Sequence, residues 1–174
     1  MRQTNSISVL AAVALAAPAV AEVRQAEPGG FVLAYKATIA APPAKVWDAL
    51  IEPGRWWNMD HSYSGDGANL TLDARAGGCF CEKVPKDGGS VEHMRVVQAR
   101  PGSLLRLSGG LGPFQAMAVS GAMSWELKPA GRGTELSMNY VVGGYVPGGA
   151  QAIAPMVDQV LADQFRRLAE AAAK

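Results

Sequence analysis

The amino-acid sequence predicts an α+β domain in which a curved antiparallel sheet of about seven strands surrounds a long C-terminal helix, with two short helices after the first strand. A stretch rich in β-branched and aromatic residues is followed by short helical segments, then by strand-like segments joined by turns, and finally by one long amphipathic segment. Short turns favour antiparallel pairing, because parallel strands need longer crossovers.

The first strand and the helices after it are predicted between Phe31 and Asn58. Residues 31–39, FVLAYKATI, are typical of a strand. Residues 41–51 begin with two prolines and continue with apolar residues at helical spacing, which predicts a helix. Pro53-Gly54 ends that helix, and residues 55–58 are expected to form a second short helical turn.

The remaining strands and the last helix follow in order. Six further strands are predicted at residues 69–73, 80–84, 90–97, 104–107, 117–127 and 134–142. The last helix is expected to carry Pro155 at its start or in its first turn, where the missing N–H is tolerated. Asp163 and Arg167 stand four residues apart on its polar side and are expected to pair.

The N-terminus has the pattern of a secretory signal peptide. The cation Arg2 precedes an apolar run, Ile7 to Val20, which ends in the small-x-small triplet Ala19-Val20-Ala21. The run is too short to span a bilayer and contains Pro18. We therefore expect residues 1–21 to be removed by cleavage after Ala21, residues 22–174 to form a single domain, and the protein to be periplasmic or secreted, with no stable membrane span.

The charge balance argues against nucleic acid as a partner. The chain has 16 Lys and Arg against 15 Asp and Glu, and removing Arg2 leaves 15 of each. A nucleic-acid-binding protein normally shows a basic stripe, and an electrostatic membrane-binding protein a lysine-rich face. The glycine-rich loops at 109–114 and 143–149 lack a phosphate-binding motif, so no cofactor is predicted.

The order of elements resembles the START-like SRPBCC superfamily, closest to its polyketide-cyclase and Aha-type ATPase-activator branches. The resemblance rests on the strand-to-helix entry at 37–50, Trp56-Trp57, Gly77-Gly78-Cys79-Phe80, the turn at 96–105 and the long C-terminal helix. It implies a helix-grip fold with a deep apolar cavity. Its members include lipid and hormone carriers, aromatic cyclases and chaperone partners, and the signal peptide argues against the chaperone-partner role.

The hairpin between Gly77 and Val97 carries the most unusual residues, and its register has two alternatives. In one register Val84 faces Val91, and Glu82 then lies opposite His93. If the register slips by one residue, Cys81 faces His93 instead. Because Phe80 and Val84 are better core residues than the cysteines, we expect their face, which includes Glu82, to point inward.

Glu82 and His93 are the candidate catalytic pair. A buried carboxylate needs a partner, and it can fix the tautomer of an imidazole and raise its basicity, as acid–base chemistry or ligand orientation requires. The alternative is an exposed cross-strand ion pair that contributes below about 1 kcal/mol.

The cysteines allow a second interpretation of the hairpin. Cys79 and Cys81, with His93 or His61 as third ligand, form a weak candidate metal site, because Cys-x-Cys departs from the usual spacing of zinc ligands. The alternatives are two partly buried thiols, or a disulfide that closes almost no loop.

The remaining candidate residues are expected to contact a ligand, which we predict to be a small hydrophobic or aromatic molecule. They lie in the loop after the short helices, on the hairpin, in the two glycine-rich loops and on the last helix: Trp56, Trp57, His61, Tyr63, Phe80, Arg95, Phe114, Tyr145, Val157 and Leu161. A cyclase- or hydrolase-type enzyme and a non-catalytic regulatory partner protein are the alternative functions.

Overall fold

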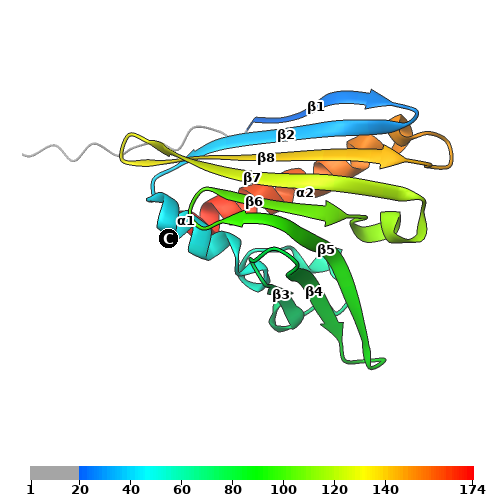
Figure 1. Cartoon of the computed structure of the whole chain (residues 1–174), viewed down its shortest axis with the longest axis horizontal. Coiled ribbons are helices and arrows are strands. Elements are labelled where there is room, and N and C mark those ends of the chain that lie inside the picture. Colours follow the sequence, from blue (N-terminus) through cyan, green and yellow to red (C-terminus); the bar gives the residue numbers. More distant parts are fainter. Residues whose placement is uncertain (1–19) are drawn as a thin grey trace, which may run out of the picture.

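The computed structural model of the protein describes residues 20–174. Most of the predicted signal peptide, residues 1–19, lies outside the described residues. Eight strands form one sheet in the order β1-β2-β8-β7-β6-β5-β4-β3, and every neighbouring pair is antiparallel. Figure 1 shows the long helix α2 (Ala150–Ala173) lying across one face of this sheet. The predicted α+β class and helix-grip fold are confirmed.

The central strands β2, β7 and β8 alternate between buried and more exposed residues along most of their length. The bounds of the eight strands are β1 (Val20–Glu27), β2 (Gly30–Ile39), β3 (Leu70–Leu72), β4 (Cys79–Val84), β5 (Gly89–Arg100), β6 (Leu104–Gly109), β7 (Val119–Ala130) and β8 (Gly133–Gly144). In β2, the buried residues Phe31, Leu33 and Tyr35 face α2, while the residues between them are more exposed. Because side chains in a strand point to opposite faces in turn, one face of the sheet is apolar and requires the cover of α2.

The sheet contains one strand more than the sequence pattern predicts. β1 pairs with β2 across the turn at Pro28-Gly29 and forms an edge of the sheet. Residues 24–27 of β1 are all exposed, so this strand lacks the alternation that marks a half-buried strand. The predicted cleavage point after Ala21 falls inside β1.

A proline stands at the first or second position of three of the short helices, α1 (Pro43–Leu50), η1 (Pro53–Arg55) and η4 (Gly112–Ala116). α1 has Pro43 at its first position and buries Val46, Trp47 and Leu50. The second helical turn predicted at residues 55–58 is replaced by two 3₁₀ helices. η1 ends at the first residue of that segment, and η2 (Met59–His61) begins just after it. Two more 3₁₀ helices, η3 (Gly67–Asn69) and η4, precede β3 and β7.

Helix α2 begins earlier than the position of Pro155 predicts. Its first residue is Ala150, so Pro155 lies in the second turn and not at the start. Pro155 is exposed, so the carbonyl that loses its intrahelical partner faces water. The predicted pair on the polar side is present, with Arg167 Nε 2.8 Å from Asp163 Oδ2.

A buried hydroxyl connects the sheet to α2 and provides a first prediction. Tyr35 Oη donates to Asp158 Oδ1 at 2.7 Å, and its ring stacks on Phe165 at 5.7 Å between centroids. Burial, together with this carboxylate, raises the pKa of Tyr35. Tyr35→Phe keeps the stacking but removes the hydrogen bond, and we expect a loss of about 1 kcal/mol in the free energy of unfolding by urea. Tyr145→Phe, whose side chain is 72% exposed, should change nothing measurable.

Candidate functional site

A cavity of about 520 Å³ lies between the sheet and α2. Its lining comes from four parts of the chain: Trp57, His61, Ser62 and Tyr63 around η2, Leu111, Gly112, Pro113 and Phe114 around η4, His93 and Tyr140 from the sheet, and Met156, Val157, Val160 and Leu161 from α2. Tyr63 and Met156 are more than half exposed and mark its mouth. This volume falls in the range of about 300–1,000 Å³ that takes drug-sized molecules.

No Lys, Arg, Asp or Glu is among the described residues that line the cavity. The polar lining consists of two histidines, Ser62 and the two tyrosines, Tyr63 and Tyr140. An ionised group taken from water into such surroundings is strongly unfavourable unless an opposite charge meets it. The cavity therefore suits an apolar molecule with few, uncharged polar groups.

A β-bulge in β5 places His93 in the wall of the cavity. Phe80 pairs with Met94, but the next pair is Cys81 with Glu92, so His93 is an extra residue on β5. Both His93 and Met94 are buried, whereas consecutive residues of a regular strand would point to opposite faces. The register that pairs Val84 with Val91 is wrong. The register slipped by one residue correctly places Cys79 opposite Arg95, but it fails from Cys81 onward, because it assumed regular pairing and the bulge shifts the pairing within the hairpin.

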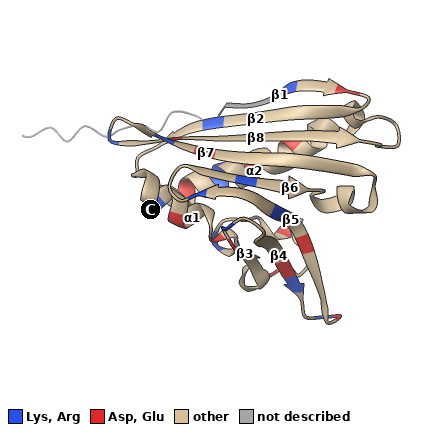
Figure 2. Ribbon diagram, viewed as in Figure 1, with Lys and Arg blue, Asp and Glu red and all other residues tan. Residues whose placement is uncertain are grey.

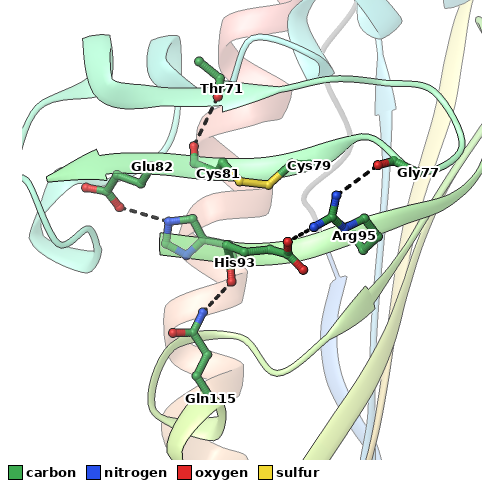
Figure 3. Close-up of a disulfide and its surroundings, with 9 residues drawn as sticks. Thr71, Gly77, Cys79, Cys81, Glu82, His93, Arg95 and Gln115 are labelled. Carbon is green, nitrogen blue, oxygen red and sulfur yellow. Dashed lines mark hydrogen bonds and ion pairs between the residues drawn. A yellow bond between two sulfur atoms is a disulfide. The ribbon is translucent and has the colours of Figure 1, made fainter. Parts of the chain in front are cut away.

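The bulge brings His93 to Glu82, and Figure 3 shows the two side chains pointing toward each other. His93 Nε2 lies 2.9 Å from Glu82 Oε2, and both side chains are almost fully buried. Glu82 also accepts hydrogen bonds from the backbone N–H of Tyr63 at 3.1 Å and of Ser64 at 2.5 Å. The carboxylate thus holds both His93 and the loop that forms one side of the cavity mouth.

The protonation states of this pair follow from burial and hydrogen bonding. Burial acts to raise the pKa of Glu82, but the hydrogen bonds from Ser64, Tyr63 and His93 outweigh it and hold the pKa below its usual value. Burial lowers the pKa of His93 despite the opposing effect of Glu82. At neutral pH the carboxylate is therefore ionised and the imidazole neutral. Because Nε2 donates to the carboxylate, the proton is on Nε2 and Nδ1 has a free lone pair.

The pair predicts a loss of stability in acid. An unfolded histidine has a pKa of about 6.5, so below this pH the unfolded chain binds a proton that folded His93 does not bind. The free energy of unfolding should therefore fall as the pH drops below about 6.5, and the depressed pKa of Glu82 adds a further loss below about 4.3. The free energy of unfolding, measured with urea between about pH 7.5 and 5.5, should change less with pH in His93→Gln than in the wild type. The same pH dependence in both proteins would contradict the assignment.

The loop between α1 and β3 is held on its other side by α2. The Asn58 backbone N–H donates to Gln164 Oε1 at 2.7 Å, and its side chain Nδ2 donates to Asp163 Oδ2 at 3.0 Å. Trp57 Nε1 donates to the His61 carbonyl at 3.0 Å, which fixes the turn between them. Contacts from both α2 and β4 therefore position the aromatic residues of this loop against the cavity.

Tyr140 is a buried polar residue of the cavity wall. Tyr140 pairs with Met123 on β7, and its ring lies over Gly121, two residues away on the same strand. A Cβ added at Gly121 would lie 2.5 Å from the tyrosine ring, so a glycine is needed there. The ring contacts Phe31 edge to face at 6.2 Å between centroids. Burial raises the pKa of Tyr140 to about 12, although the backbone at Leu111 acts in the opposite direction. Within residues 20–174, the hydroxyl has no hydrogen-bond partner of normal geometry.

The two cysteines form a disulfide on the opposite face of β4 from the cavity. Cys79 and Cys81 alternate with the buried residues Phe80 and Glu82, so their sulfur atoms point away from His93 (Figure 3). The metal site considered from the sequence would need these two thiols, which in the structure are joined in the disulfide. Because the closed loop is so short, the bond contributes at most about 1–2 kcal/mol through the unfolded chain.

The predicted ligand-contacting residues divide into two groups in the structure. Those that line the cavity are Trp57, His61, Tyr63, Phe114, Val157 and Leu161, together with His93 of the predicted catalytic pair. Trp56 and Phe80 lie in the core behind the cavity wall, where Trp57 packs against both. Arg95 is on the outer face paired with Glu92, and Tyr145 is exposed outside the cavity.

Several residues of the cavity were not singled out from the sequence as ligand contacts, namely Ser62, Tyr140, Met156, Val160 and the segment 111–113. Ser62 and the segment 111–113 do lie in loops that were expected near the opening of the cavity. A signal for Tyr140 was present, because it alternates with Met138 and Val142 on the inward face of a predicted strand. Strand order decides whether an inward residue meets the cavity or the packed core, and that order was not known.

Three further features concern charge, membrane-spanning helices and metal-ligating side chains. Figure 2 shows a ribbon that is mostly uncharged, with positive and negative residues interspersed along it. Between residues 20 and 174, no helix is both long and apolar enough to cross a membrane. No group of three or more metal-ligating side chains is found in that part of the chain.

Fold and cavity together define a helix-grip protein with an apolar internal site. Comparison with protein families gives the same assignment: the chain belongs to the family described as polyketide cyclase / dehydrase and lipid transport, which matches residues 31–173. No curated protein matches the chain.

Solved structures share the fold at low sequence identity. Protein Mll3558 from Rhizobium loti is 20% identical, with a TM-score of 0.60 over 89% of this chain and 99% of that protein. Protein CV1439 from Chromobacterium violaceum is 18% identical, with a TM-score of 0.56 over 82% and 97%. Ara h 8.0201 is 14% identical, with a TM-score of 0.56 over 83% and 98%. Identities this low support the fold alone.

Proposed function

We propose that the protein is an exported helix-grip protein that binds a small hydrophobic or aromatic molecule in the cavity between the sheet and α2. The observation that carries the proposal is the cavity of about 520 Å³ with its apolar and aromatic lining. The family description, which includes lipid transport, supports it. An open cavity of this size also argues against a regulatory protein with a filled core.

In this proposal His93 orients the ligand, and Glu82 acts through it. Glu82 does not line the cavity, whereas His93 does, and the carboxylate fixes the imidazole with Nε2 protonated. The rings of Phe80 and Tyr63 lie near the imidazole, at 4.8 Å and 5.9 Å between centroids. The imidazole therefore has one defined rotamer and one defined tautomer, as a ligand-orienting group requires.

Native mass spectrometry of the protein taken directly from its compartment would test the binding proposal. We expect a mass above that of the polypeptide, and a small apolar molecule that is released when the protein is denatured. A purified protein that carries no small molecule and binds no apolar probe would contradict it. Export is tested separately by N-terminal sequencing and cell fractionation. The mature protein should begin at Glu22 and fractionate outside the cytoplasm.

The buried pair favours one second candidate, an enzyme that uses acid–base chemistry. The free lone pair on Nδ1 of a neutral His93 could accept a proton from a bound substrate, and Glu82 would stabilise the imidazolium that forms. In that case His93→Gln should abolish product formation while the folded protein still binds the substrate. Retained turnover in this variant would exclude His93 as the base.

A further inference from the structure

The hydroxyl of Tyr140 is an unused hydrogen-bonding group at the wall of the cavity. The side chain is fully buried, and its hydroxyl has no hydrogen-bond partner of normal geometry in residues 20–174. The backbone of Leu111, which acts on the pKa of this hydroxyl, can only donate to its oxygen, so the O–H proton has no acceptor there. A buried polar group without a partner is unfavourable, and most such groups in folded proteins find a partner in the protein, a bound water or a ligand. Because Tyr140 lines the cavity, a molecule bound there can supply the missing partner.

The neighbouring polar groups make Tyr140 the donor for such a molecule. His93 already gives its Nε2 proton to Glu82, and neutral imidazole has no second N–H to donate. Tyr63, with 53% of its surface exposed, lies at the mouth and not in the interior. Trp57 Nε1 already donates to the His61 carbonyl, and neither His61 nor Ser62 is buried. Among the described lining residues, Tyr140 is therefore the fully buried side chain whose O–H group has no acceptor in the protein.

The absence of charge in the described cavity lining restricts what the donor can meet. No Lys or Arg lies among those lining residues, so a carboxylate or phosphate headgroup would enter without a counter-ion. An uncharged acceptor makes no such demand. A carbonyl oxygen is a strong, uncharged acceptor. It can be part of a flat, apolar molecule, and such a molecule suits the aromatic lining of the cavity.

We propose that the cavity selects neutral, largely apolar molecules that carry a carbonyl oxygen, and that the Tyr140 hydroxyl donates a hydrogen bond to this oxygen. The proposal rests on the proposed function, since it names the ligand class of the same cavity. Tyr140 is a specificity-determining residue in this account, and Gly121 provides the space that its ring occupies.

Three probes of nearly the same shape test the proposal: fluorene, its ketone fluorenone, and fluorene carboxylate. Their affinities for the wild-type protein and for Tyr140→Phe are measured by titration calorimetry. Quenching of the tryptophan fluorescence, to which Trp57 at the cavity contributes, is a second signal. The wild type should bind fluorenone about five- to tenfold more tightly than fluorene, the expected effect of one hydrogen bond. Tyr140→Phe should remove this difference and leave the affinity for fluorene unchanged. The carboxylate should be the weakest ligand.

The control variant is Tyr145→Phe, which loses the same hydroxyl outside the cavity and should keep the preference for the ketone. The melting temperature of ligand-free Tyr140→Phe should stay close to that of the wild type, because the hydroxyl donates to no group in residues 20–174. Equal affinities for fluorene and fluorenone, or tightest binding of the carboxylate, would overturn the carbonyl proposal while binding itself stands. If none of the three probes binds, the cavity proposal and this inference both fail.

Discussion

Glu82→Gln is expected to lower the free energy of unfolding by about 2–4 kcal/mol, more than any other single polar substitution in this structure. The carboxylate accepts hydrogen bonds from His93 and from the backbone of Tyr63 and Ser64 in a fully buried position. A glutamine of the same shape turns an N–H₂ group toward these donors, so at least one of them loses its acceptor. Urea unfolding at neutral pH measures the effect.

The matched control lies on the adjacent strand. Glu92→Gln makes the same chemical change in a side chain that is 48% exposed and paired with Arg95 on the outer face, and it should cost less than about 1 kcal/mol. Amide hydrogen exchange adds a local measurement: Tyr63 and Ser64 should lose protection in Glu82→Gln and keep it in Glu92→Gln. Similar stabilities for the two variants would show that Glu82 does not hold the loop.

Val160→Trp is expected to reduce binding of fluorene at least about tenfold, a loss of about 1.4 kcal/mol or more in binding free energy. Val160 lines the cavity from α2, so the indole would occupy the space that a ligand needs. Overpacking a filled core costs about 1–3 kcal/mol, but here the new side chain enters a space that is empty of protein atoms. The melting temperature should therefore change little while binding is lost.

Gln159→Trp is the control for this substitution. It places the same side chain one residue earlier on α2, at an exposed position that does not line the cavity. It should bind fluorene with wild-type affinity. If Val160→Trp also binds fluorene normally, the probe occupies some other site, and the cavity between the sheet and α2 is not the binding site for this class of molecule.

Most of the fold could be predicted from local sequence patterns. Strands such as β2 and β8 alternate apolar and polar residues, and α2 has an apolar side that matches the inward face of the sheet. β1 was not predicted, because its residues 24–27 are all exposed and the strand gains its structure from backbone pairing with β2. The start of α2 was misplaced because Pro155 was taken to mark the first turn. A proline is also tolerated in the second turn when the carbonyl that loses its partner faces water.

The site could be predicted only in part. Phe80 and Val84 correctly indicate that Glu82 points inward, because alternation within β4 is regular. Opposite it, the extra residue in β5 depends on tertiary contacts, including the hydrogen bond from Gln115 Nε2 to the Glu92 carbonyl at 2.8 Å. Alternation along a strand shows which residues point inward. It does not show whether an inward residue lines the cavity, as Tyr140 does, or fills the core, as Phe80 does.

The bulge at His93 also determines which part of the hairpin can change in length. It fixes the pairing of Cys79 and Phe80 on one side, independently of the turn at 85–88 on the other. Insertions or deletions in that turn would shift the exposed tip of the hairpin and leave His93 facing the cavity. Removal of one residue next to the bulge would instead restore regular alternation and turn either the imidazole or the residues of the tip to the opposite face. Relatives of this protein are therefore expected to vary freely in length at the tip and hardly at all at the bulge.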